Sequence, residues 1–107
     1  SHLIKKIRQG DEEAFEMIYR KYEGLIYYIA LSITKNKEDA EEIVQDTFVN
    51  MYKSIDTYEE KSKFKQWLMQ IARNLSYNKV TRNKEKNKRK QTWETIISKK
   101  YYPRILY

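Results

Sequence analysis

The sequence predicts an all-α fold, a compact bundle of three main helices preceded by a short N-terminal helix. Apolar residues recur at the i, i+3, i+4 spacing of buried helical stripes in several successive segments. The 107 residues include only two Gly and one Pro, few of the residues that punctuate β-hairpins. A chain of this length, with 40% hydrophobic residues, is expected to form one domain with a modest core.

The first two predicted helices are separated by a Gly-Asp pair. Leu3 to Gln9 reads as a short helix closed by Gly10 in the C′ position, where a left-handed residue commonly ends a helix. Asp11 then caps a second helix that runs to about Thr34. Its buried stripe consists of Phe15, Ile18, Tyr19, Tyr22, Leu25, Ile26, Ile29, Ala30 and Ile33.

The third predicted helix has an apolar face and an acidic face. Asn36, with Asp39 three residues later, resembles a capping box, and the helix runs from about Lys37 to Ser54. The apolar face comprises Ala40, Ile43, Val44, Thr47, Phe48, Met51 and Tyr52. The acidic face comprises Asp39, Glu41, Glu42, Gln45 and Asp46. Such a face is either a solvated helix surface, favoured by the macrodipole, or a docking surface for a basic partner.

A polar loop from Asp56 to Lys61 is predicted to precede the last strong helix, with Ser62 as its N-cap. The buried stripe of that helix consists of Phe64, Trp67, Leu68, Ile71, Ala72 and Leu75. From Thr81 to Lys90 apolar residues disappear, so the helix is expected to fray into a basic tail. The segment around Trp93 reads as a short helix or the start of a linker.

Composition excludes several classes of site. The chain has no Cys, which excludes disulfides and thiolate metal sites, and its single His2 follows Ser1 as in an expression remnant. The carboxylates have no His or Cys companion, and no nucleophile and base pair is recognisable, so we expect no metal, no cofactor and no enzymatic activity. Without a long apolar run or a signal-peptide pattern, the chain is expected to be cytoplasmic and not inserted in a membrane.

Charge is divided unevenly along the chain. Residues 1–60 contain 8 Lys and Arg against 13 Asp and Glu, a net charge of −5. Residues 61–107 contain 14 against 2, a net charge of +12. This asymmetry indicates two different partner surfaces, the basic one suited to a polyanion.

Three segments in fixed order resemble conserved region 2 of bacterial sigma-70 factors of the extracytoplasmic-function group. They are GDEEAFEMIYRKYEGLIY at 10–27, EDAEEIVQDTFVNMYKSIDTY at 38–58 and FKQWLMQIARNLSYN at 64–78, and the resemblance covers about residues 3–85. It implies a helical domain that binds the coiled-coil clamp helices of the RNA polymerase β′ subunit. The domain would recognise and help melt the promoter minus-10 element, and an anti-sigma factor would be a further partner.

The resemblance implies a role for particular residues. It places the polymerase contact on Asp39, Glu42, Gln45 and Asp46, which are expected to share the exposed side of their helix. It places the reading of the non-template strand on the loop from Ser54 to Lys61, with Tyr58 at its centre, and on Arg73, Asn74, Tyr77 and Asn78.

The chemistry of these residue types suits an extruded base. Asn74 and Asn78 are four residues apart, so their amides share a helix face and can hydrogen-bond a base edge, while Tyr58 could stack on a base. Phosphates would be neutralised by Lys61, Lys63, Lys65, Arg82 and the tract from Lys84 to Lys90. Alternatively, Tyr58 and Tyr77 cover the end of the core, Asn74 is only solvated, and the basic tail is a solvated end. Trp67 is assigned to the core because it lies on the apolar stripe.

The sequence departs from the family pattern in two ways. Many members carry Asp where this chain has Asn78, and the family's second DNA-binding domain, which reads the minus-35 element, is missing. Only 17 residues follow Lys90, so residues 86–107 are expected to be a basic tail and the start of a linker, without a region 4 domain. The chain is then either a fragment or a truncated member. Other functions left open are a sigma-like adaptor, an anti-sigma-regulated module without promoter opening, and a general basic nucleic-acid binder.

Overall fold

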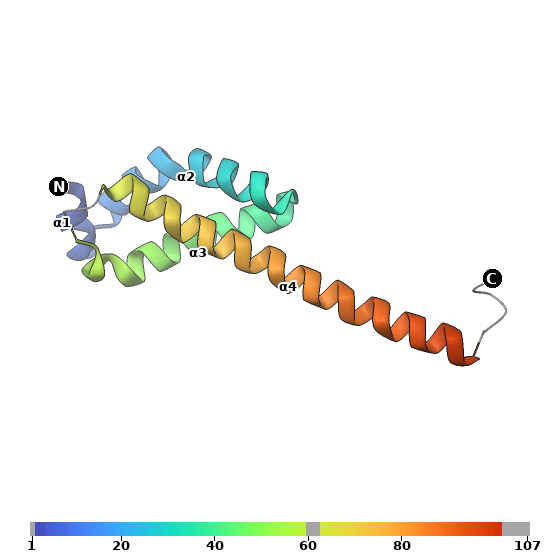
Figure 1. Cartoon of the computed structure of the whole chain (residues 1–107). Helices are drawn as coiled ribbons and strands as arrows, with labels where there is room; N and C mark the ends of the chain where they lie inside the picture. Colours follow the sequence, from blue (N-terminus) through green and yellow to red (C-terminus); the bar gives the residue numbers. More distant parts are fainter. Residues whose placement is uncertain (1, 60–62, 102–107) are drawn as a thin grey trace.

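Helices account for the regular structure of the protein. The computed structural model describes the backbone of residues 2–59 and 63–101, and the side chains of residues 2–59 and 63–85. The elements are α1 (His2–Arg8), α2 (Glu12–Thr34), α3 (Lys37–Ser54), the 3₁₀ turn η1 (Ile55–Thr57) and α4 (Phe64–Tyr101). Within the described residues there are helices and no strand, which confirms the predicted all-α class. The helices α2, α3 and the first half of α4 pack side by side, with α1 at one end (Figure 1).

Local capping explains where the helices begin. The side-chain carboxylate of Asp11 accepts a hydrogen bond from the backbone N–H of Ala14 at 3.1 Å. The Asn36 side-chain oxygen accepts from the backbone N–H of Asp39 at 2.9 Å. Each cap satisfies an N–H group that has no partner inside its helix, so the predicted starts of α2 and α3 are confirmed.

The turn between α1 and α2 depends on Gly10. This residue has a φ of +82°, the left-handed conformation that glycine adopts without a steric penalty. Its N–H donates to the carbonyl of Ile7 at 2.9 Å, and the N–H of Asp11 donates to the carbonyl of Lys6 at 3.0 Å. These two bonds form a Schellman motif with Gly10 at the predicted C′ position.

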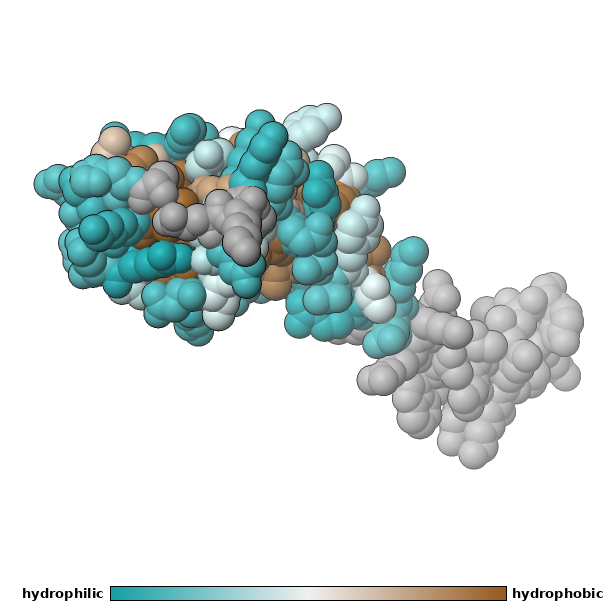
Figure 2. Space-filling model, turned by 60° about the vertical axis from the view of Figure 1, so that its left-hand side comes forward, coloured by the Kyte–Doolittle hydropathy of each residue, from teal (hydrophilic) through white to brown (hydrophobic). Residues whose placement is uncertain are grey.

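One hydrophobic core joins every element. Ile7 of α1, Ile26 of α2, Phe48 of α3, Ile55 of η1 and Leu68 of α4 are each no more than 3% exposed and belong to the same cluster. Burying a side chain of this size contributes about 1.5–3 kcal/mol, so the core dominates the stability of the bundle. Hydrophilic residues cover most of the visible bundle surface, with hydrophobic residues between them (Figure 2).

The helix α4 is longer than predicted. We expected fraying between Thr81 and Lys90, but the helical backbone continues to Tyr101 and extends beyond the bundle (Figure 1). The prediction was wrong because it equated a missing apolar stripe with a missing helix. Lys, Arg, Gln and Glu are good helix formers, and the sequence between Phe64 and Tyr101 contains no Gly or Pro.

Candidate docking and nucleic-acid surfaces

The acidic face of α3 is divided between solvent and a neighbouring helix. Glu42, Gln45 and Asp46 are exposed, whereas the side chain of Asp39 is 20% exposed and turned toward α4. The four residues predicted to contact a partner are therefore not equally accessible. Asp39 and Glu42 contact side chains of α4, whereas Gln45 lines a hollow between α2 and α3 and Asp46 is exposed.

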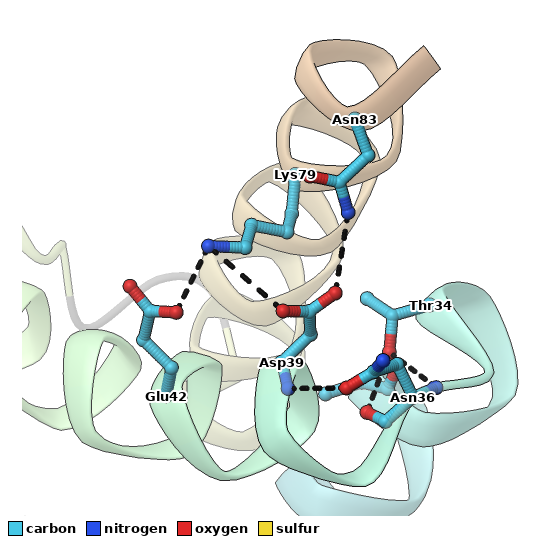
Figure 3. Close-up of polar contacts among 7 residues, drawn as sticks. Thr34, Asn36, Asp39, Glu42, Lys79 and Asn83 are labelled. Carbon is cyan, nitrogen blue, oxygen red and sulfur yellow. Dashed lines mark hydrogen bonds and ion pairs between the residues drawn. The ribbon is translucent and has the colours of Figure 1, made fainter. Parts of the chain in front are cut away.

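Those contacts form a polar bridge between α3 and α4 (Figure 3). The Lys79 ammonium lies 2.9 Å from a carboxylate oxygen of Glu42 and 4.0 Å from one of Asp39. The Asn83 amide donates to the other Asp39 oxygen at 3.2 Å. We call Asp39, Glu42, Lys79 and Asn83 the α3–α4 bridge. It pairs the start of the acidic helix with the basic helix inside one molecule.

The bridge changes the electrostatics of Glu42. The hydrogen bond from Lys79, followed by its positive charge, lowers the pKa of the Glu42 carboxyl below its ordinary value. No local sequence pattern identifies Lys79 or Asn83 as partners of α3. Their spacing of four residues on one helix face matches the three-residue spacing of Asp39 and Glu42, but the pairing also requires the two helices to be neighbours.

The exposed side of α3 is flanked by two hollows. The first, of about 450 Å³ between α2 and α3, is lined by Tyr19, Glu23, Gly24, Tyr27, Glu41, Val44 and Gln45. There, burial and the neighbouring Glu23 raise the pKa of the Tyr19 hydroxyl. The second, of about 550 Å³ at the other end of α3, is lined by Gly10, Asp11, Glu12, Phe15, Phe48, Val49, Tyr52 and Lys53. Val49 and Tyr52 are 48% and 51% exposed, so the face is acidic in its first half and apolar in its second.

Tyr58 is part of the core and not of a surface. Only 6% of it is exposed, and its ring centroid lies 5.6 Å from that of Phe64 and 5.0 Å from that of Trp67. The prediction that Tyr58 offers a stacking surface is thus not supported in this conformation, because the ring faces neighbouring aromatic side chains. Its alternative role, covering the end of the core, is the one that the structure shows. Trp67 is half-buried and packs against the core, as expected.

Three of the predicted DNA-contacting residues lie together on α4. Asn74, Tyr77 and Asn78 are exposed, at spacings of three and four residues, with Tyr77 59% exposed. The side-chain oxygen of Asn74 accepts a hydrogen bond from the amide of Gln70 at 2.9 Å, in a solvent-exposed pair that a ligand can replace. These side chains form a polar row that can accept and donate hydrogen bonds.

The predicted phosphate-contacting cations lie before and after this row along the chain. Lys63 and Lys65 are exposed at the start of α4, and Arg82 is exposed one turn beyond Asn78. Arg73 is half-buried. Lys61 lies outside the described residues. Exposed cations thus precede and follow the hydrogen-bonding amides in the sequence, and cations of this kind can neutralise phosphates.

Two further findings concern the described part of the chain. It contains no group of three or more His, Cys, Asp or Glu residues that could hold a metal ion. None of the helices described is both long and apolar enough to span a bilayer.

Comparison with known proteins reveals matches to one family. The family described as sigma-70 region 2 matches residues 18–86. The sigma factor SigW of Bacillus subtilis, an extracytoplasmic-function (ECF) RNA polymerase sigma factor, is 35% identical over 81 residues, 76% of this chain and 43% of the relative. SigM of the same organism, also an ECF sigma factor, is 41% identical over 68 residues, 64% of this chain and 41% of the relative.

The other comparisons are consistent with these. The ECF sigma-E factor of Haemophilus influenzae is 30% identical over 79 residues, 74% of this chain and 41% of the relative. An engineered region 2 of sigmaE, solved by NMR in complex with GTAAAA, superposes with a TM-score of 0.72 at 24% identity, covering 78% of this chain and 87% of that one. It has the same fold. The chain spans about two fifths of the length of these curated relatives.

Proposed function

The chain belongs to the sigma-70 region 2 family, and we propose from this that it is a non-enzymatic domain that joins RNA polymerase to promoter DNA during transcription initiation. In this proposal α3 binds the β′ clamp helices, and α4 binds the non-template strand of the minus-10 element and helps to open it. Such a domain works in the cytoplasm, with the polymerase. One observation supports the proposal most directly: Asp46 and Asn74 are both exposed, on different helices.

Docking to polymerase would rely on the exposed part of α3. Gln45 and Asp46 supply polar and charged contacts, and Val49 and Tyr52 add an apolar area one to two turns later. Carboxylates at such an interface steer association with a basic partner and set its register more than they add affinity. An anti-sigma factor that covers the same part of α3 would exclude polymerase by competition.

Binding of the strand would rely on the exposed row of α4. Asn74 and Asn78 would hydrogen-bond the edge of an extruded base, and the exposed ring of Tyr77 could stack on it. Lys63, Lys65 and Arg82 would neutralise phosphates, as would Lys61 by its position in the sequence. Tyr58 is left out of this set because its ring is buried.

The proposal is tested by measuring binding to two ligands separately. The 107-residue chain should bind purified β′ clamp helices, and charge reversal at Asp46 should weaken that binding. The matched control is Glu13→Lys, which makes the same change of charge at an exposed position on α2. Fluorescence anisotropy with labelled single-stranded hexanucleotides, starting with GTAAAA and its permutations, should reveal a preference among sequences.

Two results would contradict the proposal. If neither the wild type nor the Glu13→Lys control binds the clamp helices, α3 is not a polymerase-docking surface. If the chain also binds unrelated duplexes with uniform affinity, it is a general basic nucleic-acid binder, because phosphate contacts alone carry no sequence information.

A further inference from the structure

The helix α1 is firmly attached to the bundle although it is short. Its residues Ile4 and Ile7 are 4% and 1% exposed and belong to the main core cluster. The helix ends at Arg8, immediately before the Schellman turn that reverses the chain into α2. The backbone position of Arg8 is therefore fixed by the packing of α1 against the core.

The Arg8 side chain reaches the connection between α3 and α4. Its terminal Nη2 donates to the carbonyl of Tyr58 at 2.8 Å, across 50 residues of sequence. Its Nε donates to the carbonyl of Ile55 at 3.4 Å, across 47 residues. Hydrogen bonds from a guanidinium are charge-assisted and stronger than those between neutral groups, and the planar group can hold two acceptors in a set geometry.

Tyr58 is consequently held at both its backbone and its ring. Arg8 binds its carbonyl, while its ring packs against Phe64 and Trp67 in the first turn of α4. The N–H of Tyr58 donates to Ile55, whose carbonyl also accepts from Arg8. Through Tyr58, α1 is thus connected to the end of η1 and to the beginning of α4.

We propose that Arg8 is a positioning residue for strand recognition: by holding the carbonyls of Ile55 and Tyr58, it fixes where α4 begins relative to the bundle. The inference rests on the proposed function of α4. Selective binding requires that hydrogen-bonding groups be ordered before the ligand arrives, since ordering them on binding reduces affinity. Arg8 does not need to touch DNA for this role. Through Arg8, α1 stabilises the position of the binding surface on α4.

The experiment compares Arg8→Ala and Arg8→Lys with the control Arg20→Ala. Arg20 is an exposed arginine whose Nη2 lies 2.7 Å from the Glu16 carboxylate on α2, so its removal makes the same change of charge away from the α3–α4 connection. Two quantities are measured in the 107-residue chain at a temperature where every variant is folded. The first is the hydrogen-exchange rate of the Tyr58 amide. The second is an affinity ratio: the affinity for the best hexanucleotide from a randomised single-stranded pool, divided by the affinity for scrambled versions of that hexanucleotide.

Arg8→Ala should accelerate exchange at Tyr58 and reduce the affinity ratio by about two- to tenfold, the size expected for one net hydrogen bond. Arg8→Lys keeps the charge but not the two-acceptor geometry, so it should restore only part of the ratio. Arg20→Ala should change neither quantity. The salt dependence of binding should be equal in the Arg8→Ala and Arg20→Ala variants, because a positioning residue does not neutralise a phosphate.

The possible failures are distinguishable. A wild-type chain with no preference among hexanucleotides would overturn the proposed function and the role of Arg8 with it. A wild-type preference that Arg8→Ala retains as fully as Arg20→Ala would overturn the role of Arg8 alone. Complete restoration by Arg8→Lys would show that charge, and not geometry, is what matters at this position, which would also overturn the inference.

Discussion

Charge reversal at two carboxylates of α3 should separate partner docking from internal pairing. Glu42 lies 2.9 Å from Lys79 in the α3–α4 bridge, whereas Asp46 is exposed and has no ion pair within the described part of the chain. Glu42→Lys places two ammonium groups against each other at the exposed contact between α3 and α4. Asp46→Lys reverses a charge that only a partner would contact. The two variants are therefore expected to differ in stability even where both weaken docking.

The size of the docking effect follows from the exposure of Asp46. An exposed ion pair contributes about 0.2–1 kcal/mol, and reversal replaces the attraction by a repulsion of similar size, so the change is about 0.4–2 kcal/mol. This corresponds to a rise of about two- to thirtyfold in the Kd for the β′ clamp helices. The rise should shrink at high salt, because screening weakens exposed charges most.

Calorimetric titration with the clamp helices and thermal melts followed by circular dichroism measure the two effects. Asp46→Lys should raise the Kd and leave the Tm unchanged, whereas Glu42→Lys should also lower the Tm. Exchanging the charges of the Glu42–Lys79 pair, in Glu42→Lys with Lys79→Glu, should recover part of the lost Tm without restoring docking; recovery is partial because the new carboxylate at position 79 also faces Asp39. Binding of Asp46→Lys as tight as that of the Glu13→Lys control would contradict the docking role of α3. A double variant that melts as low as Glu42→Lys alone would contradict the Glu42–Lys79 ion pair.

Three further predictions concern the strand-binding row, the core and pH. Asn74→Ala should reduce discrimination among hexanucleotides by about 1–1.5 kcal/mol in anisotropy titrations, in the lower part of the usual range because the amide gives up its bond to Gln70 on binding. Arg82→Ala should instead weaken binding to all sequences equally and lower the salt dependence of the binding constant. If Asn74→Ala also lost the same affinity for every sequence, Asn74 would not take part in base recognition. Leu68→Ala should lower the free energy of unfolding, measured by urea denaturation, by about 2–5 kcal/mol because Leu68 is fully buried. A decrease below about 1 kcal/mol, roughly that of a surface substitution, would contradict this packing. Because the pKa of Glu42 is lowered in the folded state, its stabilising contribution is present above the ordinary carboxyl value of 4.5 and is lost as pH falls through the lower folded pKa. The Tm difference between wild type and Glu42→Gln should thus vanish in acid, and a difference that persists there would exclude the ion pair as its cause.

The starts and ends of most helices could be predicted because their causes are local. The Asp11 and Asn36 caps each bind an N–H group three residues away, and the Gly10 turn involves groups at most five residues apart. The buried stripes are equally local, since the period of the helix brings their residues to one face. The all-α class and the exposure of Asn74 followed from these patterns. The length of α4 did not follow from them, because the helix continues after its apolar stripe ends, through residues of high helix propensity.

Tertiary structure alone decided which polar and aromatic residues meet. Tyr58 is buried because Phe64 and Trp67 pack around it, and its carbonyl is bound by Arg8 from 50 residues away. Asp39 and Glu42 face Lys79 because α3 and α4 lie side by side, so half of the predicted docking set is engaged in contacts within the molecule, although the Glu42 side chain remains 54% exposed. Helical period determines the face on which a side chain lies, and the sequence carries that information within a few residues. Which face of another helix it meets depends on how the whole core packs, so no short stretch of sequence contains it.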